Sequence, residues 1–152
     1  MGYRTVSTIE RYPNLLVVDN SVIMRWFFSD GSEVDKAYAE DVLRHMKTNQ
    51  IMPVVPTLWV SEACFVSNSY VKKKGFSTSV VQEKLTNAFD MLFVVDSFLD
   101  PVVLFDYAYR YKLSDYDANY ALLAENLNCP LATLDKKLKK AVISAKGSSL
   151  DF

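Results

Sequence analysis

Four short apolar runs, rich in β-branched residues, alternate with longer amphipathic stretches along the chain. Runs of this length and composition are typical of strands buried in a parallel sheet. The runs are Leu15–Val18, Ile51–Val55, Phe93–Val95 and Leu131–Leu134. Pro53 in the second run has no backbone N–H to donate, which predicts an edge or irregular strand there.

Helical periodicity and capping signals fill the stretches between the runs. The predicted helices are Ser21–Phe28, Glu33–Lys47, Thr57–Lys74, one opened by a capping box at Ser79 and Gln82, one from the Asp100-Pro101 cap to about Lys112, one from Ser114 to about Asn128, and Lys136–Ala145. Parallel strands need such crossover connections. The alternation therefore predicts an α/β fold with three α/β/α layers and a central parallel sheet of four to five strands.

The chain has the length of one domain, at 152 residues. Residues 1–13 are interpreted as an N-terminal extension and residues 14–152 as a single domain. No apolar run approaches the roughly twenty residues of a membrane-spanning helix, and the N-terminus lacks the apolar stretch of a secretory signal. We therefore expect a cytoplasmic protein without a membrane partner.

Several classes of chemistry are disfavoured by what the sequence lacks. His45 is the single histidine, and Cys64 and Cys129 have no partner at metal-ligand spacing, which argues against zinc and against a histidine base. The four glycines are dispersed, so no glycine-rich nucleotide loop is present. Ser21 stands where a phosphatase of the haloacid dehalogenase type needs a second aspartate after Asp19.

Four acidic residues are predicted to meet at one edge of the sheet. Asp19 and Asp135 directly follow predicted strands, and ligands of open parallel sheets bind at these carboxyl ends. Glu62 and Asp117 lie in early turns of helices that start from the same edge. Taken alone, Asp117 could simply complete a capping box, and Asp19 and Asp135 could simply begin helices, but the joint pattern favours one site.

The surroundings of these acids indicate a metal. Glu62 lies among Trp59, Val60, Ala63 and Phe65, where an unpaired carboxylate is costly. Several carboxylates together repel one another unless protons or a cation compensate. An all-carboxylate set without cysteine or histidine suits Mg²⁺, with Mn²⁺ as a plausible substitute.

The segments around the acids resemble a known family, the PIN domain, and within it the VapC ribonuclease toxins of VapBC toxin-antitoxin pairs. The resemblance runs from Leu15 to about Asp151. It rests on Val17-Val18-Asp19-Asn20-Ser21 with Trp26-Phe27, on Ser61-Glu62-Ala63, on Leu113-Ser114-Asp115-Tyr116-Asp117-Ala118 with Tyr120, and on Ala132-Thr133-Leu134-Asp135-Lys136-Lys137-Leu138.

The resemblance implies roles for individual residues. The family's metal-binding catalytic acids correspond to Asp19, Glu62, Asp117 and Asp135. Ser21 and Thr133 match supporting hydroxyls, and Asp115 is an additional acid beside them. Phe65 departs from the family, in which asparagine often occupies that position. The implied activity is a Mg²⁺- or Mn²⁺-dependent endoribonuclease that hydrolyses RNA phosphodiester bonds, as a homodimer with a cognate VapB-type antitoxin.

Basic and aromatic residues supply further candidates for contacts. The net charge is only −1, but Lys136, Lys137, Lys139 and Lys140 follow the last acid and are predicted to bind RNA phosphates, with Arg25 as a weaker candidate. Lys72–Lys74 fit a solvated helix end equally well. Aromatic candidates for dimer or antitoxin contacts are Trp26, Phe27, Tyr70 and Phe76.

Two alternative functions remain open at this point. A PIN-like domain with a degraded site would only bind RNA or protein, although the intact acids argue against this. A structure-specific DNA nuclease would use the same metal chemistry, although the chain lacks appended helical clamps.

Overall fold

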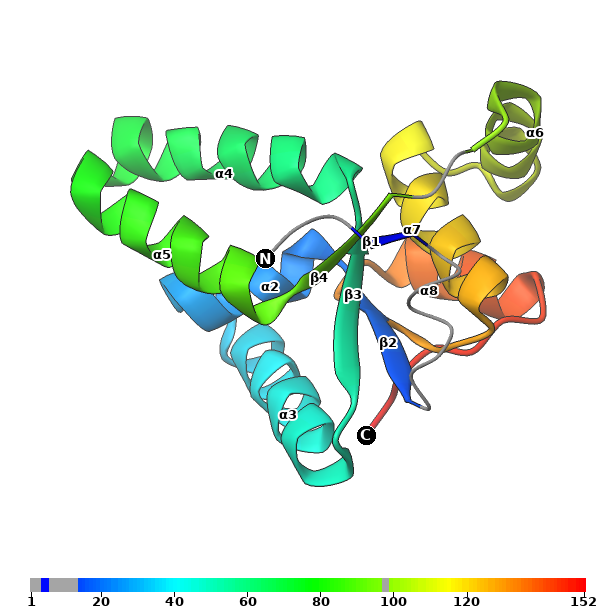
Figure 1. The fold of residues 1–152 in the computed structure, drawn as a ribbon, viewed down its shortest axis with the longest axis horizontal. Coiled ribbons are helices and arrows are strands. Elements are labelled where there is room, and N and C mark those ends of the chain that lie inside the picture. Colours follow the sequence, from blue (N-terminus) through cyan, green and yellow to red (C-terminus); the bar gives the residue numbers. More distant parts are fainter. Residues whose placement is uncertain (1–3, 6–13, 97–98) are drawn as a thin grey trace.

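Five parallel strands form the centre of the molecule (Figure 1). The computed structural model describes residues 4–5, 14–96 and 99–152. The strands are β1 (Arg4–Thr5), β2 (Leu15–Val18), β3 (Met52–Pro56), β4 (Phe93–Asp96) and β5 (Leu131–Ala132), in the spatial order β1-β4-β3-β2-β5. In β2, Val17 lies opposite Val54 of β3 on one side and Leu131 of β5 on the other.

Helices cover both faces of this sheet. They are α2 (Asn20–Phe28), α3 (Glu33–Asn49), α4 (Leu58–Lys74), α5 (Thr78–Met91), α6 (Pro101–Tyr111), α7 (Asp115–Leu127) and α8 (Lys136–Ser144). In Figure 1, α2 to α5 lie to the left of the sheet and α6 to α8 to the right. The chain steps from β2 to β3 to β4 in one direction and then returns to β5, so right-handed crossovers place the last connection on the opposite face. The predicted three-layer α/β/α fold is confirmed.

Of the two predictions drawn from Pro53, the edge position was wrong, because β3 lies in the middle of the sheet. The Met52 amide donates to the Asn14 carbonyl on the β2 side, at 3.0 Å. Strand alternation therefore turns the Pro53 nitrogen toward β4, and pairing with β4 begins only at Val54. A proline is tolerated where the missing N–H would have met no partner.

Two predicted boundaries also shift. Helix α5 is capped by Ser77, whose hydroxyl accepts from the Val80 amide at 3.3 Å, so the predicted capping box at Ser79 was wrong. Ser79 with Gln82 fits the capping-box pattern, but Ser77, the first serine after the turn at Gly75 that ends α4, takes the cap position without a glutamine or glutamate partner. Strand β5 ends at Ala132 instead of Leu134, which frees the next residue, Thr133, for the site described below.

Segments from near the two ends of the chain extend the two edges of the sheet. β1 falls within the predicted extension 1–13 and pairs with β4, with Arg4 opposite Val95; the remainder of that extension lies outside the described residues. At the other edge, Leu131 donates to the Ser148 carbonyl at 3.0 Å. Across residues 4–5, 14–96 and 99–152, no helix has both the length and the apolar character needed to traverse a bilayer.

The core fixes the helices that carry the acids. Trp59 in α4 and Tyr120 in α7 are the largest fully buried side chains. Both lie within one turn of a predicted site acid. The predicted apolar face of α7 is buried at Tyr120, Leu123 and Leu127, whereas Tyr116, placed on the same face by its spacing, is exposed.

Candidate metal and nucleic-acid site

Asp19 is the most buried of the four acids and is held in one orientation. It follows β2 and stands as the residue before α2. Its Oδ2 accepts hydrogen bonds from the Ser21 and Thr133 hydroxyls, each at 2.7 Å. Burial raises the pKa of Asp19, the nearby charge of Asp117 raises it further, and the two hydroxyls partly offset the rise. Ser21 and Thr133 therefore hold the carboxylate, as the resemblance implied.

The same two hydroxyls tie Asp19 to the segment that carries Asp135. The Leu134 amide donates to Ser21 Oγ at 3.2 Å, and the Asp135 amide donates to Thr133 Oγ1 at 3.0 Å. Asp135 Oδ1 accepts from the amides of Lys137 and Leu138, at 2.7 and 3.1 Å. Asp135 is thus the N-cap of α8, and its charge also reaches Asp117, so the capping role leaves a role in the site possible.

Among the four predicted acids, Glu62 has the carboxyl group whose charge is least offset by neighbouring groups. Its Oε1 is buried and has no hydrogen-bond partner in the described part of the chain. Burial raises the pKa of Glu62 to about 7, and the charges of Asp19 and Asp117 add to that rise. The Tyr120 hydroxyl lies close enough to lower this pKa somewhat, but the two groups do not reach normal hydrogen-bonding geometry.

Asp117 completes the group from the first turn of α7. Its amide donates to the Ser114 hydroxyl at 3.1 Å, so the predicted Ser114 cap is present. Burial raises the pKa of Asp117, the charge of Asp135 adds to this, and the charge of Lys137 opposes it. Asp115, two residues earlier, is exposed.

Mutual electrostatic effects connect all four predicted acids. Asp19, Glu62 and Asp117 influence one another, and Asp135 acts on Asp117. Among the residues that the structure describes, no three acidic, histidine or cysteine side chains are grouped as they would be around one ion. The donor chemistry nevertheless suits a hard divalent cation, because the candidate donors are all carboxylate oxygens and the buried Glu62 Oε1 lacks a partner among the described residues.

The predicted phosphate-binding lysines differ in their surroundings. Lys136, Lys137 and Lys140 are exposed at the start of α8, and Lys137 is near enough to Asp117 to affect its pKa. Lys139 forms an ion pair with Asp151 near the C-terminus. The free lysines closest to the acids are therefore on the first turn of α8.

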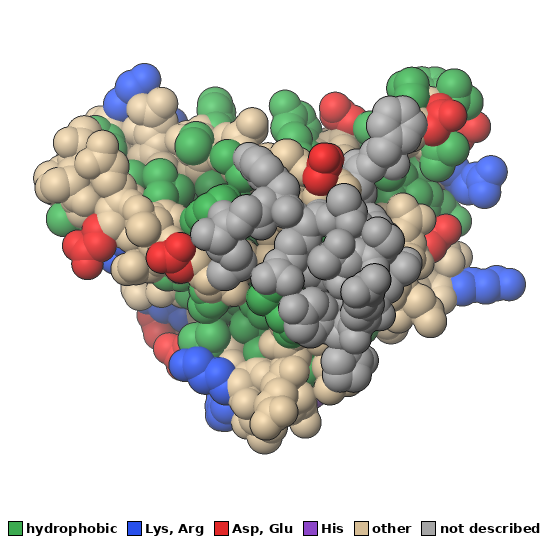
Figure 2. Space-filling model, in the orientation of Figure 1, with side chains coloured by type: hydrophobic (Ala, Val, Ile, Leu, Met, Phe, Trp, Pro, Cys, Tyr) green, Lys and Arg blue, Asp and Glu red, His purple; other side chains and the backbone are tan. Residues whose placement is uncertain are grey.

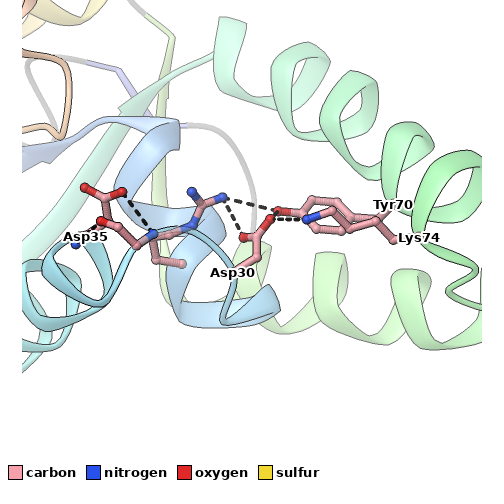
Figure 3. Close-up of polar contacts among 6 residues, drawn as sticks. Asp30, Asp35, Tyr70 and Lys74 are labelled. Atoms are coloured by element: carbon pink, nitrogen blue, oxygen red, sulfur yellow. Dashed lines mark hydrogen bonds and ion pairs between the residues drawn. The ribbon is translucent and has the colours of Figure 1, made fainter.

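Arg25 belongs to a different cluster, with Asp30, Tyr70 and Lys74, three residues that Figure 3 labels. Its Nη2 lies 2.7 Å from Asp30 Oδ1 and 3.2 Å from the Tyr70 hydroxyl. Lys74 Nζ lies 2.7 Å from Asp30 Oδ2, so part of the Lys72–Lys74 run also belongs to this cluster. The structure thus gives Arg25 an ionic partner inside the protein and does not bring it to the acids.

The aromatic residues proposed for partner contacts are largely used within the fold. Tyr70 is only 4% exposed and stacks on Phe28 with ring centroids 3.8 Å apart. Trp26 Nε1 donates to the Ala39 carbonyl at 2.7 Å, and Trp26, Phe27 and Phe76 pack partly buried against the core.

Sequence reasoning missed a buried support for the helix that carries Glu62. Trp59 Nε1 donates to Asn20 Oδ1 at 3.0 Å, which links the start of α2 to the first turn of α4. Asn20 directly follows Asp19, so one contact aligns the elements that carry Asp19 and Glu62. A polar side chain next to an acid at a strand end was the only sequence signal for it.

These features define an α/β domain with a carboxylate cluster at the carboxyl edge of a parallel sheet. The family model for the PIN domain matches residues 16–143, and the chain belongs to this family. PIN domains are generally nucleases and typically use divalent metal ions. A search of the curated proteins finds no significant match.

A solved structure supports the same fold. The crystal structure of PAE2754 from Pyrobaculum aerophilum is similar to this chain with a TM-score of 0.65 at 18% sequence identity. The similarity covers 93% of this chain and 88% of that one, so the two share the fold along most of their lengths.

Proposed function

We propose that this protein is a Mg²⁺-dependent endoribonuclease that hydrolyses RNA phosphodiester bonds, with Mn²⁺ able to substitute. The observation that carries the proposal is the electrostatically connected group of carboxylates, in which Glu62 Oε1 is buried without a partner. Such uncompensated burial is characteristic of functional sites. Membership of a family of nucleases supports the same reaction class.

In this proposal Asp19, Glu62, Asp117 and Asp135 hold the metal. A bound divalent ion lowers the pKa of a water ligand and stabilises charge that develops on the phosphate. Ser21 and Thr133 keep Asp19 in a fixed orientation through their hydrogen bonds to Oδ2. This preorientation reduces the reorganisation needed when the ligand sphere forms.

Lysines on α8 would position the RNA backbone. Lys136 and Lys137 are exposed next to the acids, where they can contact phosphates on either side of the cleaved bond. Lys140 lies one turn further along, and Lys139 would have to leave Asp151 to take part. Asp115 is exposed beside Asp117 and would act, if at all, on the outer ligand shell.

The resemblance to VapC toxins supports two partners. One is a VapB-type antitoxin that covers the carboxylates, and the other is a second copy of the chain in a homodimer. We propose that the protein is the toxin of such a pair.

The decisive experiment is incubation of the purified protein with total RNA and Mg²⁺, with single-stranded DNA in a parallel reaction. We expect RNA fragments that disappear with EDTA and in Asp117→Asn, and that persist in Asp106→Asn, an exposed aspartate on α6 that serves as the matched control. Cleavage of DNA alone would replace the proposal with a DNA nuclease. Metal binding without cleavage of either substrate would contradict a catalytic role.

A further inference from the structure

We infer that a pocket beside Glu62 binds one unpaired nucleobase of the RNA, held against the rings of Phe65 and Tyr116. This inference rests on the proposed ribonuclease function and adds the form of the substrate, which is single-stranded around the cleaved bond. Neither aromatic residue belongs to the carboxylate group or to its supporting hydroxyls.

The pocket has the position and size that this role requires. It has a volume of about 600 Å³ and is lined by Ser61, Glu62, Phe65, Val66 and Tyr116. Glu62 borders both this pocket and the carboxylate group, and Tyr116 directly precedes Asp117. A base in the pocket would therefore belong to a nucleotide next to the phosphate at the acids.

The two rings are available to a ligand. Phe65 is 79% exposed and Tyr116 is 49% exposed. Among the described residues no aromatic ring contact involves either of them. By contrast, the exposed Phe105 and Tyr109 on α6 stack on each other, with centroids 6.0 Å apart and planes at 18°. Figure 2 shows hydrophobic side chains along the upper edge of the molecule over α4 and again over α6.

The charges around the pocket favour a base over the other parts of a nucleotide. Its walls are mainly apolar, and its lining includes the carboxyl group of Glu62 and no basic side chain, so a phosphate would find no cationic partner there. A neutral aromatic ring gains stacking contacts with Phe65 and Tyr116 and displaces water from exposed apolar surface. The phosphates remain for the lysines of α8.

A base can enter such a pocket only when it is not stacked in a helix. Sequence-tolerant recognition of single-stranded RNA commonly uses aromatic side chains in this way. We therefore expect the protein to cleave single-stranded segments in preference to duplex RNA.

The test is a kinetic comparison on a single-stranded oligoribonucleotide cut at one mapped position. Stacking of one base corresponds to roughly a 5- to 150-fold change in affinity. Phe65→Ala/Tyr116→Ala should raise KM by about tenfold or more while kcat changes by less than about threefold, because base binding is shared by ground and transition states. Phe65→Tyr/Tyr116→Phe should retain the normal KM.

Two controls make the result specific. Phe105→Ala/Tyr109→Ala removes another exposed Phe and Tyr pair, outside the pocket, and should leave KM unchanged. An oligonucleotide with an abasic site next to the cleaved bond should raise KM for the unaltered protein by the same factor. It should cause no further loss in Phe65→Ala/Tyr116→Ala, because the ring and the base would be two halves of one contact.

Each other outcome overturns the inference in a recognisable way. An unchanged KM in a variant that still cleaves RNA removes the base pocket and leaves the proposed function intact. Additive losses from the variant and the abasic site would mean that the rings act elsewhere. A changed sedimentation coefficient with normal KM would make the pocket a protein interface. A chain that cuts no RNA at all would overturn both this inference and the proposed function.

Discussion

The carboxylates in two clusters of charged residues have opposite electrostatic surroundings. Asp30, between α2 and α3, accepts from the Tyr70 hydroxyl at 2.6 Å and from Lys74 Nζ at 2.7 Å, with Arg25 on its other oxygen (Figure 3). Burial alone would raise the pKa of Asp30, but these hydrogen bonds and charges outweigh it and the pKa is lowered. The charges of Arg25 and Lys74 therefore favour the ionised carboxylate of Asp30, although its Oδ1 makes no hydrogen bond of normal geometry within the described residues.

The acids at the carboxyl edge of the sheet lack this compensation. Burial is the largest influence on Asp19, Glu62 and Asp117, their mutual repulsion adds to it, and the pKa of each is raised. Of the nearby cations, Lys137 lowers the pKa of Asp117, and its effect does not reverse the shift. A compensated cluster stabilises the fold, whereas an uncompensated one gains stability only when a ligand arrives.

The largest expected effect comes from Asp19→Asn. Removing a carboxylate that we propose as a metal ligand should lower RNA cleavage by at least about a hundredfold, as loss of a central transition-state stabiliser does. In EDTA the same variant should melt at the same temperature or higher, because repulsion with Asp117 falls while the amide oxygen can still accept from Ser21 and Thr133. Cleavage assays and thermal melts measure the two effects.

Metal binding gives this prediction a second readout. Mg²⁺ should raise the melting temperature of the unaltered protein and should do so much less for Asp19→Asn, since only the native carboxylates bind it well. Equal stabilisation of both proteins would place the ion elsewhere. A large loss of stability in EDTA would mean that Asp19 is compensated in the way that Asp30 is.

Asp30→Asn should have the opposite effects on stability and on RNA cleavage. It leaves Arg25 and Lys74 without their carboxylate, and loss of charged hydrogen bonds in a partly buried site lowers the free energy of unfolding by roughly 1–3 kcal/mol. RNA cleavage at a temperature where the variant is folded should be unchanged. Urea denaturation supplies the measurement.

Asp41→Asn is the matched control for Asp30→Asn. Asp41 pairs with Arg44 one turn along α3, on the surface. Its loss should change the free energy of unfolding by less than about 1 kcal/mol. If the two variants were equally stable, the Asp30 cluster would be no more than a surface ion pair.

Much of the fold and the position of Asp19 and Asp135 directly after strands followed from local signals. Short β-branched runs, each followed by a helix, are sufficient to predict a parallel sheet, and residues directly after such runs must lie at its carboxyl edge. Asp19 and Asp135 were predictable for that reason. The position of Asp117 in the first turn after the Ser114 cap could likewise be predicted from neighbouring residues alone.

What failed depended on partners distant in the sequence. Pro53 is tolerated in a central strand because of where β4 begins to pair, which no local pattern records. The internal contacts of Arg25, a weaker candidate for RNA binding, could not be predicted either, because Asp30 and Tyr70 bind it and Tyr70 is on another helix. Tyr116 fits the spacing of the buried face of α7, yet it lies in the exposed first turn beyond the core.

How far neighbouring groups offset the charge of each acid likewise depends on the tertiary structure. The smallest expected effect, on the pH dependence of stability, tests it. The pKa of Glu62 is about 7 in the folded protein against an ordinary value of 4.5. Between these values the folded state holds a proton that the unfolded state has lost, so in EDTA stability should fall as pH rises from about 4.5 to about 7. Asp30 acts with the opposite sign, because its lowered pKa gives stability that is lost as pH falls below its ordinary value of 3.8.

Glu62→Gln should flatten the decline in stability between pH 4.5 and 7 without abolishing it, since the raised pKa values of Asp19 and Asp117 contribute in the same direction. Glu83→Gln, an exposed glutamate on α5, should leave the profile unchanged. Urea midpoints at pH 5 and pH 8 in EDTA measure the effect.

Adding Mg²⁺ at pH 8 should restore the stability lost by the unaltered protein, because the cation then takes the place of the proton. An identical profile for Glu62→Gln would show that Glu62 is compensated in solution and would remove the contrast between the two clusters.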